Sequence, residues 1–184
     1  TYMLKKNSCK KKTFFDEIEI KKFDKEHDNF WNKDKKNYKT ILDRRSSFLN
    51  WRYLNRPDKK YLCFKVFDKK KIYLGYFVLK IYKEQKIKKI HIVDLFFKKL
   101  DRVYCRNICE TILNKIYKKK FNESEISFWL NGDKNFIYSF KNLGFKKSRF
   151  RWMIMKGIDE KYFKQNKIDL NDIYFTMGDT LEIY

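Results

Sequence analysis

The residues best suited to chemistry lie within one apolar segment and just after it. Asp94 is the only carboxylate in "KIHIVDLFF" (89–97), where most other side chains are apolar. A carboxylate in such surroundings must be paired, because burial otherwise raises its pKa. In an open cleft it is suited to act as a general base that takes a proton from an attacking amine. The alternative is a structural carboxylate that bonds a loop or Arg52.

The segment that follows is basic and contains no glycine. "KKLDRVYCRN" (98–107) leads into a helix predicted at 101–119. Without glycine, Cβ atoms crowd the approach of an anion to the backbone N–H groups, and Asp101 adds a negative charge there. A phosphate at this junction would therefore depend on the basic side chains, which are Lys98, Lys99, Arg102 and Arg106.

A second group of candidates comes from two other segments. Trp51 and Arg52 lie in "ILDRRSSFLNWRYL" (41–54), where the Trp could stack on a sugar ring and the Arg could bind a carboxylate or sugar acid. Asp179, in "MGDT" (177–180), could reach the same acceptor. The alternatives are a core Trp51, an Arg52 that bridges to Asp94 or Asp179, and a plain Gly-Asp turn.

The cysteines and histidines do not form a metal-binding pattern. No Cys-x-x-Cys pair is present, and His27 and His91 are far from the cysteines in sequence. Cys105 and Cys109 are four residues apart and are expected on one helical face as small buried side chains. We therefore expect no metal, and free thiols without a visible leader favour a reducing, cytoplasmic location.

The net charge of +22 on 184 residues first suggests a polyanionic partner. The basic residues are, however, 37 Lys against 8 Arg, and the sequence has no Ala, one Pro and five Gly. AT-rich codons give this composition without selection for binding, and Arg is the residue that recognises phosphates and bases in two-point contacts. We therefore do not expect nucleic acid as the main partner. No apolar run reaches the roughly 20 residues of a membrane helix, so no membrane span is expected.

Hydrophobic periodicity predicts an α/β (α+β) fold in a single domain, 1–184. Strands are predicted at 14–23, 61–67, 72–82, 89–97, 124–130, 148–155 and 172–177, and helices at 26–38, 41–54, 101–119 and after Asp133. The three strands between 61 and 97 form a meander, and the helix that follows makes the next strand parallel to 89–97. We expect a mixed, mostly antiparallel sheet of six to seven strands, flanked by helices, with a ligand at the parallel step.

This order of elements resembles the GNAT acetyltransferase fold over nearly the whole chain. "YSFKNLGF" (138–145) is similar to the family's second motif, and "FLNWRYLNRPDKKY" (48–61), "IVDLF" (92–96) and "YFTMGDT" (174–180) resemble a GNAT subgroup associated with surface-polysaccharide genes. In that subgroup two GNAT-like halves are often joined in tandem, and this chain resembles the C-terminal half. The protein partner implied is an N-terminal GNAT-like half, or a second copy in a homodimer.

The resemblance implies acetyl-CoA, or another acyl-CoA, as cofactor and a small-molecule amine or amino sugar as acceptor. In the GNAT fold the third meander strand and the following parallel strand splay apart, and the pantetheine arm lies in the opening. Here pantetheine would pair with the backbone of Leu95, Phe96 and Phe97. The pyrophosphate would rely on the basic side chains, Lys98, Arg102 and Arg106 among them, because the family's glycine loop is absent.

The implied catalytic groups also depart from the family. Phe140 stands where the usual general-acid Tyr would be, and a phenyl ring has no proton to give a departing thiolate. Tyr138, two residues away, becomes the candidate acid beside Asp94 as base. Three functions therefore remain open: an acyl-CoA-dependent N-acyltransferase for a sugar or cell-surface-related amine, a catalytically degenerate GNAT-like domain that serves as a binding or structural half, and a basic nucleic-acid-binding module.

Overall fold

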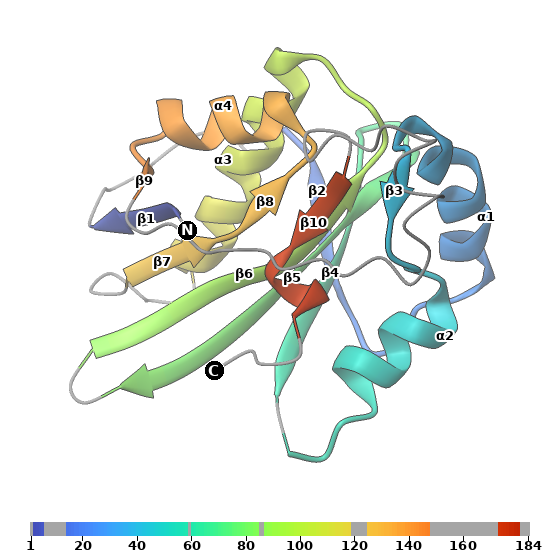
Figure 1. Cartoon of the computed structure of the whole chain (residues 1–184), viewed down its shortest axis with the longest axis horizontal. Helices are drawn as coiled ribbons and strands as arrows, with labels where there is room; N and C mark the ends of the chain where they lie inside the picture. The colour runs from blue at the N-terminus through green and yellow to red at the C-terminus, as the bar shows by residue number, and fades with distance from the viewer. Residues whose placement is uncertain are drawn as a thin grey trace, which may run out of the picture.

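The central layer of the protein is a seven-stranded sheet in the order β2-β4-β5-β6-β7-β1-β9 (Figure 1). The computed structural model describes residues 2–5, 14–58, 60–84, 87–118, 125–147 and 173–180. Neighbouring strands of this sheet are antiparallel, except that β6 and β7 are parallel. The predicted mixed, mostly antiparallel sheet is thus confirmed. Its strands are β1 (Tyr2–Lys5), β2 (Asp16–Ile20), β4 (Tyr61–Phe67), β5 (Tyr73–Glu84), β6 (Ile87–Phe97), β7 (Glu125–Phe128) and β9 (Lys146–Lys147).

Helices cover both faces of this sheet. On one side lie α1 (Lys25–Asp34) and α2 (Ser46–Leu49), and on the other lie α3 (Arg102–Lys118) and α4 (Lys134–Asn142) (Figure 1). The side chain of Asp133 accepts hydrogen bonds from two backbone N–H groups at the start of α4, and Gly144 follows that helix at φ 96°. The short capped helix predicted after Asp133 is therefore confirmed. Within the described residues, no helix is both long and apolar enough to cross a membrane.

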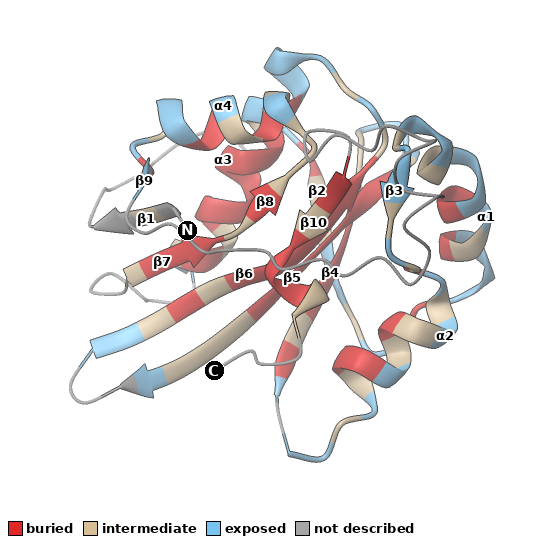
Figure 2. Cartoon of the chain, in the orientation of Figure 1, coloured by how far each residue is buried: buried red, intermediate tan, exposed pale blue. Residues whose placement is uncertain are grey.

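The two faces of β6 pack against different helices. Because side chains alternate along a strand, Asp94 and Phe96 share one face and Leu95 and Phe97 share the other. Phe96 packs edge-on against Trp31 of α1, with ring centroids 5.1 Å apart, and Phe97 stacks on Phe136 of α4 at 5.2 Å. Both faces of β6 are thus buried from Ile92 to Phe97, whereas its first residues are exposed (Figure 2).

The buried face of helix α3 contains Cys105 and Cys109, the two cysteines predicted to share one helical face. Burial raises the pKa of both helical thiols, that of Cys105 to about 12 and that of Cys109 well above its ordinary value. Both cysteines are small buried side chains, as expected. They lie beside the buried aliphatic residues of the helix, which are Ile108, Ile112, Leu113 and Ile116.

A smaller sheet lies against the central one. The strand β10 (Ile173–Thr176) pairs in parallel with β3 (Thr40–Ile41) and antiparallel with β8 (Leu130–Asn131), and a 3₁₀ turn, η4 (Met177–Asp179), follows it. The strand predicted at 172–177 is confirmed, but it belongs to this smaller sheet. The strand predicted at 148–155 lies outside the described residues.

The helix predicted over 41–54 is wrong at its start. Residues 40–41 form β3, and α2 begins only at Ser46, continuing as a π-helical turn, η2 (Asn50–Leu54). A distant carboxylate fixes this start, because Asp28 accepts hydrogen bonds from the backbone N–H and the hydroxyl of Ser46, each at 2.7 Å. Residues 42–45 therefore lie outside any helix or strand, and Arg44 among them is fully buried.

Candidate functional site

The two parallel strands separate halfway along β6. They pair from Lys89 and Glu125 to Ile92 and Phe128, and beyond that point β6 continues to Phe97 with β5 as its neighbour but without β7. The register between β5 and β6 shifts between Val78 and Leu79, where β6 has an extra residue, so a bulge marks the point of separation. The geometry thus contains the opening that the family resemblance implies.

Side chains of β10 close this opening. The hydroxyl of Tyr174 donates a hydrogen bond to the backbone carbonyl of Leu95, on the stretch of β6 that β7 leaves unpaired. The Tyr174 ring packs edge-on against Phe96, with centroids 5.7 Å apart and planes at 87°. Of the three residues predicted to pair with pantetheine, Leu95 therefore already has a hydrogen-bond partner for its carbonyl.

A buried ionic cluster fastens β10 and η4 onto β6. We call it the Arg44 cluster; it comprises Arg44, Asp94, Thr176 and Asp179. Arg44 Nη2 lies 2.6 Å from Asp179 Oδ2, and Arg44 Nε lies 3.4 Å from Asp94 Oδ1. All four side chains are shielded from solvent. The cluster joins the segment before α2, the middle of β6 and the turn after β10.

Asp94 is held as an acceptor by several donors at once. The hydroxyls of Tyr53 and Tyr76 donate to Asp94 Oδ2 at 3.1 Å and 2.9 Å, and the Thr176 hydroxyl donates to Asp94 Oδ1 at 3.0 Å. Only 1% of Asp94 is exposed. The role of Asp94 as a base stays a prediction, and in this arrangement its oxygens face donors of the protein.

Burial and the neighbouring charges together shift the pKa values of the cluster. Burial alone would lower the pKa of Arg44, but the carboxylates of Asp94 and Asp179 raise it well above its ordinary value. Burial raises the pKa of Asp179, and the nearby charge of Asp94 adds to that rise. Asp179 also accepts a hydrogen bond from the backbone N–H of Thr176 at 2.8 Å. The one buried guanidinium of Arg44 thus forms ion pairs with both carboxylates, and the charge on each carboxylate is stabilised by it.

Of the three residues predicted to bind the acceptor, only Asp179 belongs to this cluster. Trp51 and Arg52 lie outside it. Arg52 Nη2 donates to the carbonyl of Thr180, so the alternative in which Arg52 bridges to Asp94 or Asp179 is wrong, because Arg44 bonds both carboxylates. Trp51 is 61% exposed and lies against Phe48, so the core-Trp alternative is also wrong. The π-helical turn explains both, since it turns Arg52 inward and leaves Trp51 outside. Sugar stacking by Trp51 stays a prediction.

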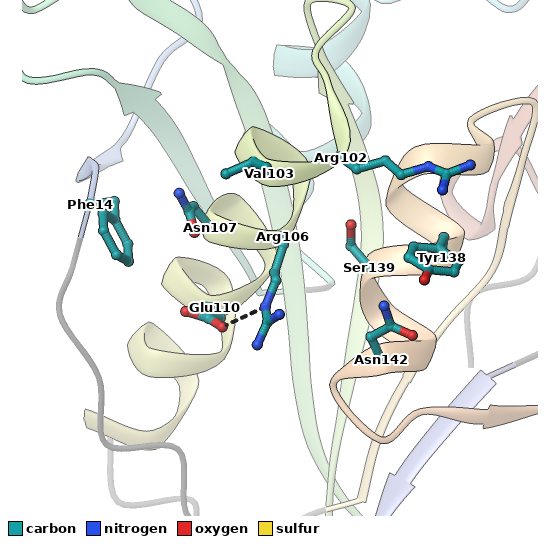
Figure 3. A pocket seen from close by; sticks show the side chains of 9 residues that line it. All are labelled: Phe14, Arg102, Val103, Arg106, Asn107, Glu110, Tyr138, Ser139 and Asn142. Atoms are coloured by element: carbon teal, nitrogen blue, oxygen red, sulfur yellow. Dashed lines mark hydrogen bonds and ion pairs between the residues drawn. The ribbon is translucent and has the colours of Figure 1, made fainter.

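Two of the four predicted phosphate-binding residues, Arg102 and Arg106, lie elsewhere, in a groove between α3 and α4 (Figure 3). The guanidinium of Arg102 lies over the ring of Tyr138, 4.9 Å from its centroid, and Arg106 Nε donates to Glu110 Oε1 at 3.2 Å. This α3–α4 groove has a volume of about 690 Å³. It is lined by Phe14, Arg102, Val103, Arg106, Asn107, Glu110, Tyr138, Ser139 and Asn142.

The groove and the Arg44 cluster lie on opposite faces of β6. Asp94 shares a face with Phe96, which packs on α1, whereas α4 packs on the other face. The structure therefore does not bring together Asp94 and Tyr138, and their pairing as base and acid stays a prediction. Glu110 was missed by the sequence reasoning, although its position four residues after Arg106 on one helix was a usable signal.

The start of α3 is capped by its own chain. Asp101 accepts a hydrogen bond from the backbone N–H of Tyr104 at 2.9 Å, so a carboxylate already occupies the helix N-terminus. Lys98 and Lys99 lie just before it, and the backbone N–H of Lys98 donates to the Leu74 carbonyl. Together with the Tyr174 contact, this carboxylate means that the residues present do not fit an acyl-CoA bound as the family resemblance implies.

Comparison with known proteins gives only distant similarity. No protein-family model and no curated protein sequence matches the chain. Similar solved structures include a protein from Pyrococcus furiosus described as an acetyl transferase, with a TM-score of 0.49, 13% identity, and coverage of 78% of this chain and 98% of that one. The aminoglycoside acetyltransferase meta-AAC0020, from an uncultured soil metagenomic sample and in complex with sisomicin, has a TM-score of 0.45 at 16% identity, covering 78% and 97%. A GCN5-related glucosamine N-acetyltransferase region of a fungal GH3 beta-N-acetylglucosaminidase has a TM-score of 0.40 at 15% identity, covering 70% of this chain and 14% of that one.

Proposed function

We propose that this chain is a GNAT-like domain whose own cofactor cleft is closed, and that it serves as a structural or binding half beside a catalytic partner such as an N-terminal GNAT-like half. The observation that carries this proposal is the hydrogen bond from Tyr174 to the Leu95 carbonyl, at the place where the parallel strands separate. Pantetheine would need that strand edge for its own amides. The Tyr174 hydroxyl occupies the Leu95 carbonyl on that edge instead.

Opening the cleft would be costly, because Tyr174 is not a loose side chain. It belongs to β10, which is paired on both sides, and the turn after it is held by the ion pair between Arg44 and Asp179. Separating that pair would leave a buried charge without its partner, which costs several kcal/mol, roughly 3–5. The carboxylate of Asp101 at the α3 N-terminus would in addition repel an incoming pyrophosphate.

The second candidate is the acyl-CoA-dependent N-acyltransferase, acting on a sugar or cell-surface-related amine. The strand separation and the bulge beside it favour this candidate, because they supply a place for an extended ligand once β10 and η4 move away. In that state Asp94 would be the base and Arg102 and Arg106 would bind phosphate, while Trp51, Arg52 and Asp179 would line the acceptor site.

Calorimetry with CoA and acetyl-CoA separates the two candidates. We expect the unmodified protein to bind neither at millimolar ligand and to transfer no acetyl group to glucosamine. Tyr174→Phe frees the Leu95 carbonyl but keeps the ring, so binding that appears only in this variant would identify the hydroxyl as the closing element. Tight binding by the unmodified protein that is lost in the double variant Arg102→Ala, Arg106→Ala would instead establish the acyltransferase candidate.

A further inference from the structure

We propose that the α3–α4 groove is a docking surface for an acidic segment of a partner protein that also carries aromatic or aliphatic side chains. The groove lies on the α3–α4 side of the sheet and the closed cleft on the α1 side, so this inference does not depend on the cleft being closed. Three observations support it: the exposed apolar residues around the groove, the way its two arginines are held, and the sign of its charge.

Apolar side chains gather around the groove although solvent reaches them. The exposed fraction is 42% for Phe14, 66% for Val103 and 48% for Tyr138. Single exposed apolar residues are ordinary on a protein surface, but several around one hollow mark a site of interaction. The two helices that carry most of these residues pack against the sheet, so the surface is rigid and little entropy is lost when a partner orders on it.

The two arginines are oriented but remain accessible. The guanidinium carbon of Arg102 lies over the Tyr138 ring, and the side chain is exposed, so its N–H groups remain available to an acceptor. The side chain of Arg106 is 53% exposed although its Nε bonds Glu110, whose own side chain is 6% exposed. Glu110 therefore orients the Arg106 side chain from its buried side and leaves the rest of that side chain exposed to solvent. Tyr and Arg are the residues that most often dominate binding energy at protein interfaces.

The charge of the groove selects the partner. Two exposed guanidinium groups face solvent, while the one carboxylate in the lining is buried beneath Arg106. Carboxylates accept from guanidinium groups in two-point contacts, so an acidic segment complements this surface. A second copy of the chain does not, because a two-fold interface through this groove would bring two basic surfaces together.

The test is fluorescence anisotropy with a labelled peptide of about twelve residues in which Glu and Asp alternate with Leu, Phe and Trp. The chain is so basic that any polyanion will bind it weakly, so the readout is the difference between variants. Arg102→Gln and Tyr138→Ser are the groove variants. Arg45→Gln is the matched control, because Arg45 is equally charged, has a 63% exposed side chain and lies at the start of α2.

We expect each groove variant to weaken peptide binding about 10-fold or more and the control to change it less than about 2-fold, since central Tyr and Arg residues carry most of the energy of such contacts. Circular dichroism on all three variants establishes that they remain folded. Equal losses in the groove variants and the control would overturn the proposal, as would absence of peptide binding at millimolar concentration. A single-stranded oligonucleotide that binds more tightly than the peptide, with the same dependence on Arg102 and Tyr138, would overturn it in favour of nucleic acid.

Discussion

The Arg44 cluster and the α3–α4 groove use the same kinds of side chain in opposite ways. Each brings together arginine and carboxylate and has tyrosine beside it: Tyr53 and Tyr76 bond Asp94 of the cluster, and Tyr138 lies against Arg102 in the groove. In the cluster every one of these groups is buried and bonded within the protein, whereas in the groove the arginines and Tyr138 remain open to solvent. Residue types alone therefore say little about binding, and burial decides which group of residues is available to a ligand.

This difference also separates structural from binding roles. Removing one member of a buried ion pair leaves an uncompensated charge away from water, which destabilises the fold strongly. An exposed pair is screened by solvent and contributes little to stability. We therefore expect substitutions in the cluster to change the free energy of unfolding, and substitutions in the groove to change binding while leaving stability nearly unaltered.

The largest expected effect is that of Arg44→Met. It leaves Asp94 and Asp179 buried beside each other without their shared cation, and we expect a loss of about 3–5 kcal/mol in the free energy of unfolding. Arg102→Met, the matched change in the groove, removes only an exposed cation–π contact and should cost less than about 1 kcal/mol. Urea titration followed by tryptophan fluorescence measures both. Similar losses in the two variants would mean that the distinction between the regions is false.

Next in size is the effect of Tyr174→Phe. The variant leaves the buried Leu95 carbonyl without its donor, and such an unsatisfied group costs about 1–3 kcal/mol. Tyr138→Phe removes a hydroxyl from an exposed ring and should stay within about 0.5 kcal/mol of the unmodified protein. The same urea titration compares the two tyrosines. A stable Tyr174→Phe protein would indicate that the contact contributes little to closure.

Gly178→Ala tests how tightly η4 is packed against the cluster. A Cβ atom at this position would overlap the Tyr53 hydroxyl and lie 3.2 Å from Asp94 Cβ. Overpacking of this kind costs about 1–3 kcal/mol. Asn142→Ala, at an exposed position of the groove, should change stability by less than about 0.5 kcal/mol. If Gly178→Ala melts at the same temperature as the unmodified protein, the turn has room to move and the cleft is easier to open than we propose.

The smallest expected effect is a dependence on pH that belongs to the cluster side alone. His27 Nε2 donates to the Arg44 carbonyl at 2.7 Å, and burial lowers the pKa of His27 below its usual 6.5, against the opposing charges of Asp28 and Asp24. The unfolded chain therefore takes up this proton first as the pH falls, so stability is lost below about pH 6.5, at up to about 1.4 kcal/mol per pH unit.

His27→Gln should flatten that loss between pH 6.5 and pH 5, measured as the difference in unfolding free energy from the unmodified protein. Taking the difference cancels the contribution of Asp179, whose raised pKa acts in the opposite direction. Arg102→Gln should leave the slope unchanged, because the guanidinium does not titrate in this range. An unaltered slope in His27→Gln would assign the acid sensitivity to another group.

Much of the fold could be predicted because it is encoded locally. Alternation along 61–97 gives the meander, and helical spacing from Cys105 to Ile116 gives α3. The parallel step then follows from the handedness of the crossover. The strand β1 could not be found in this way, because four residues carry little periodicity and their partners lie in β7 and β9, far along the sequence.

For the Arg44 cluster, the sequence could predict that Asp94 needs a partner but not which residue supplies it. The sequence requires a partner for Asp94, but Arg44, Arg45, Arg52 and Arg56 all lie within one short stretch. Which of them reaches Asp94 depends on where α2 begins, and that is set by Asp28 in another helix. A local helical pattern over 41–54 contains no information about this tertiary cap.

The placement of β1 has a consequence for folding on the ribosome. Tyr2 pairs with both Phe128 and Lys147, so β1 is synthesised well before either of its neighbouring strands. Until those strands emerge, both edges of β1 are open to pairing with other chains. A slow final step of sheet closure, and a sensitivity of yield to the rate of translation, follow from this one strand.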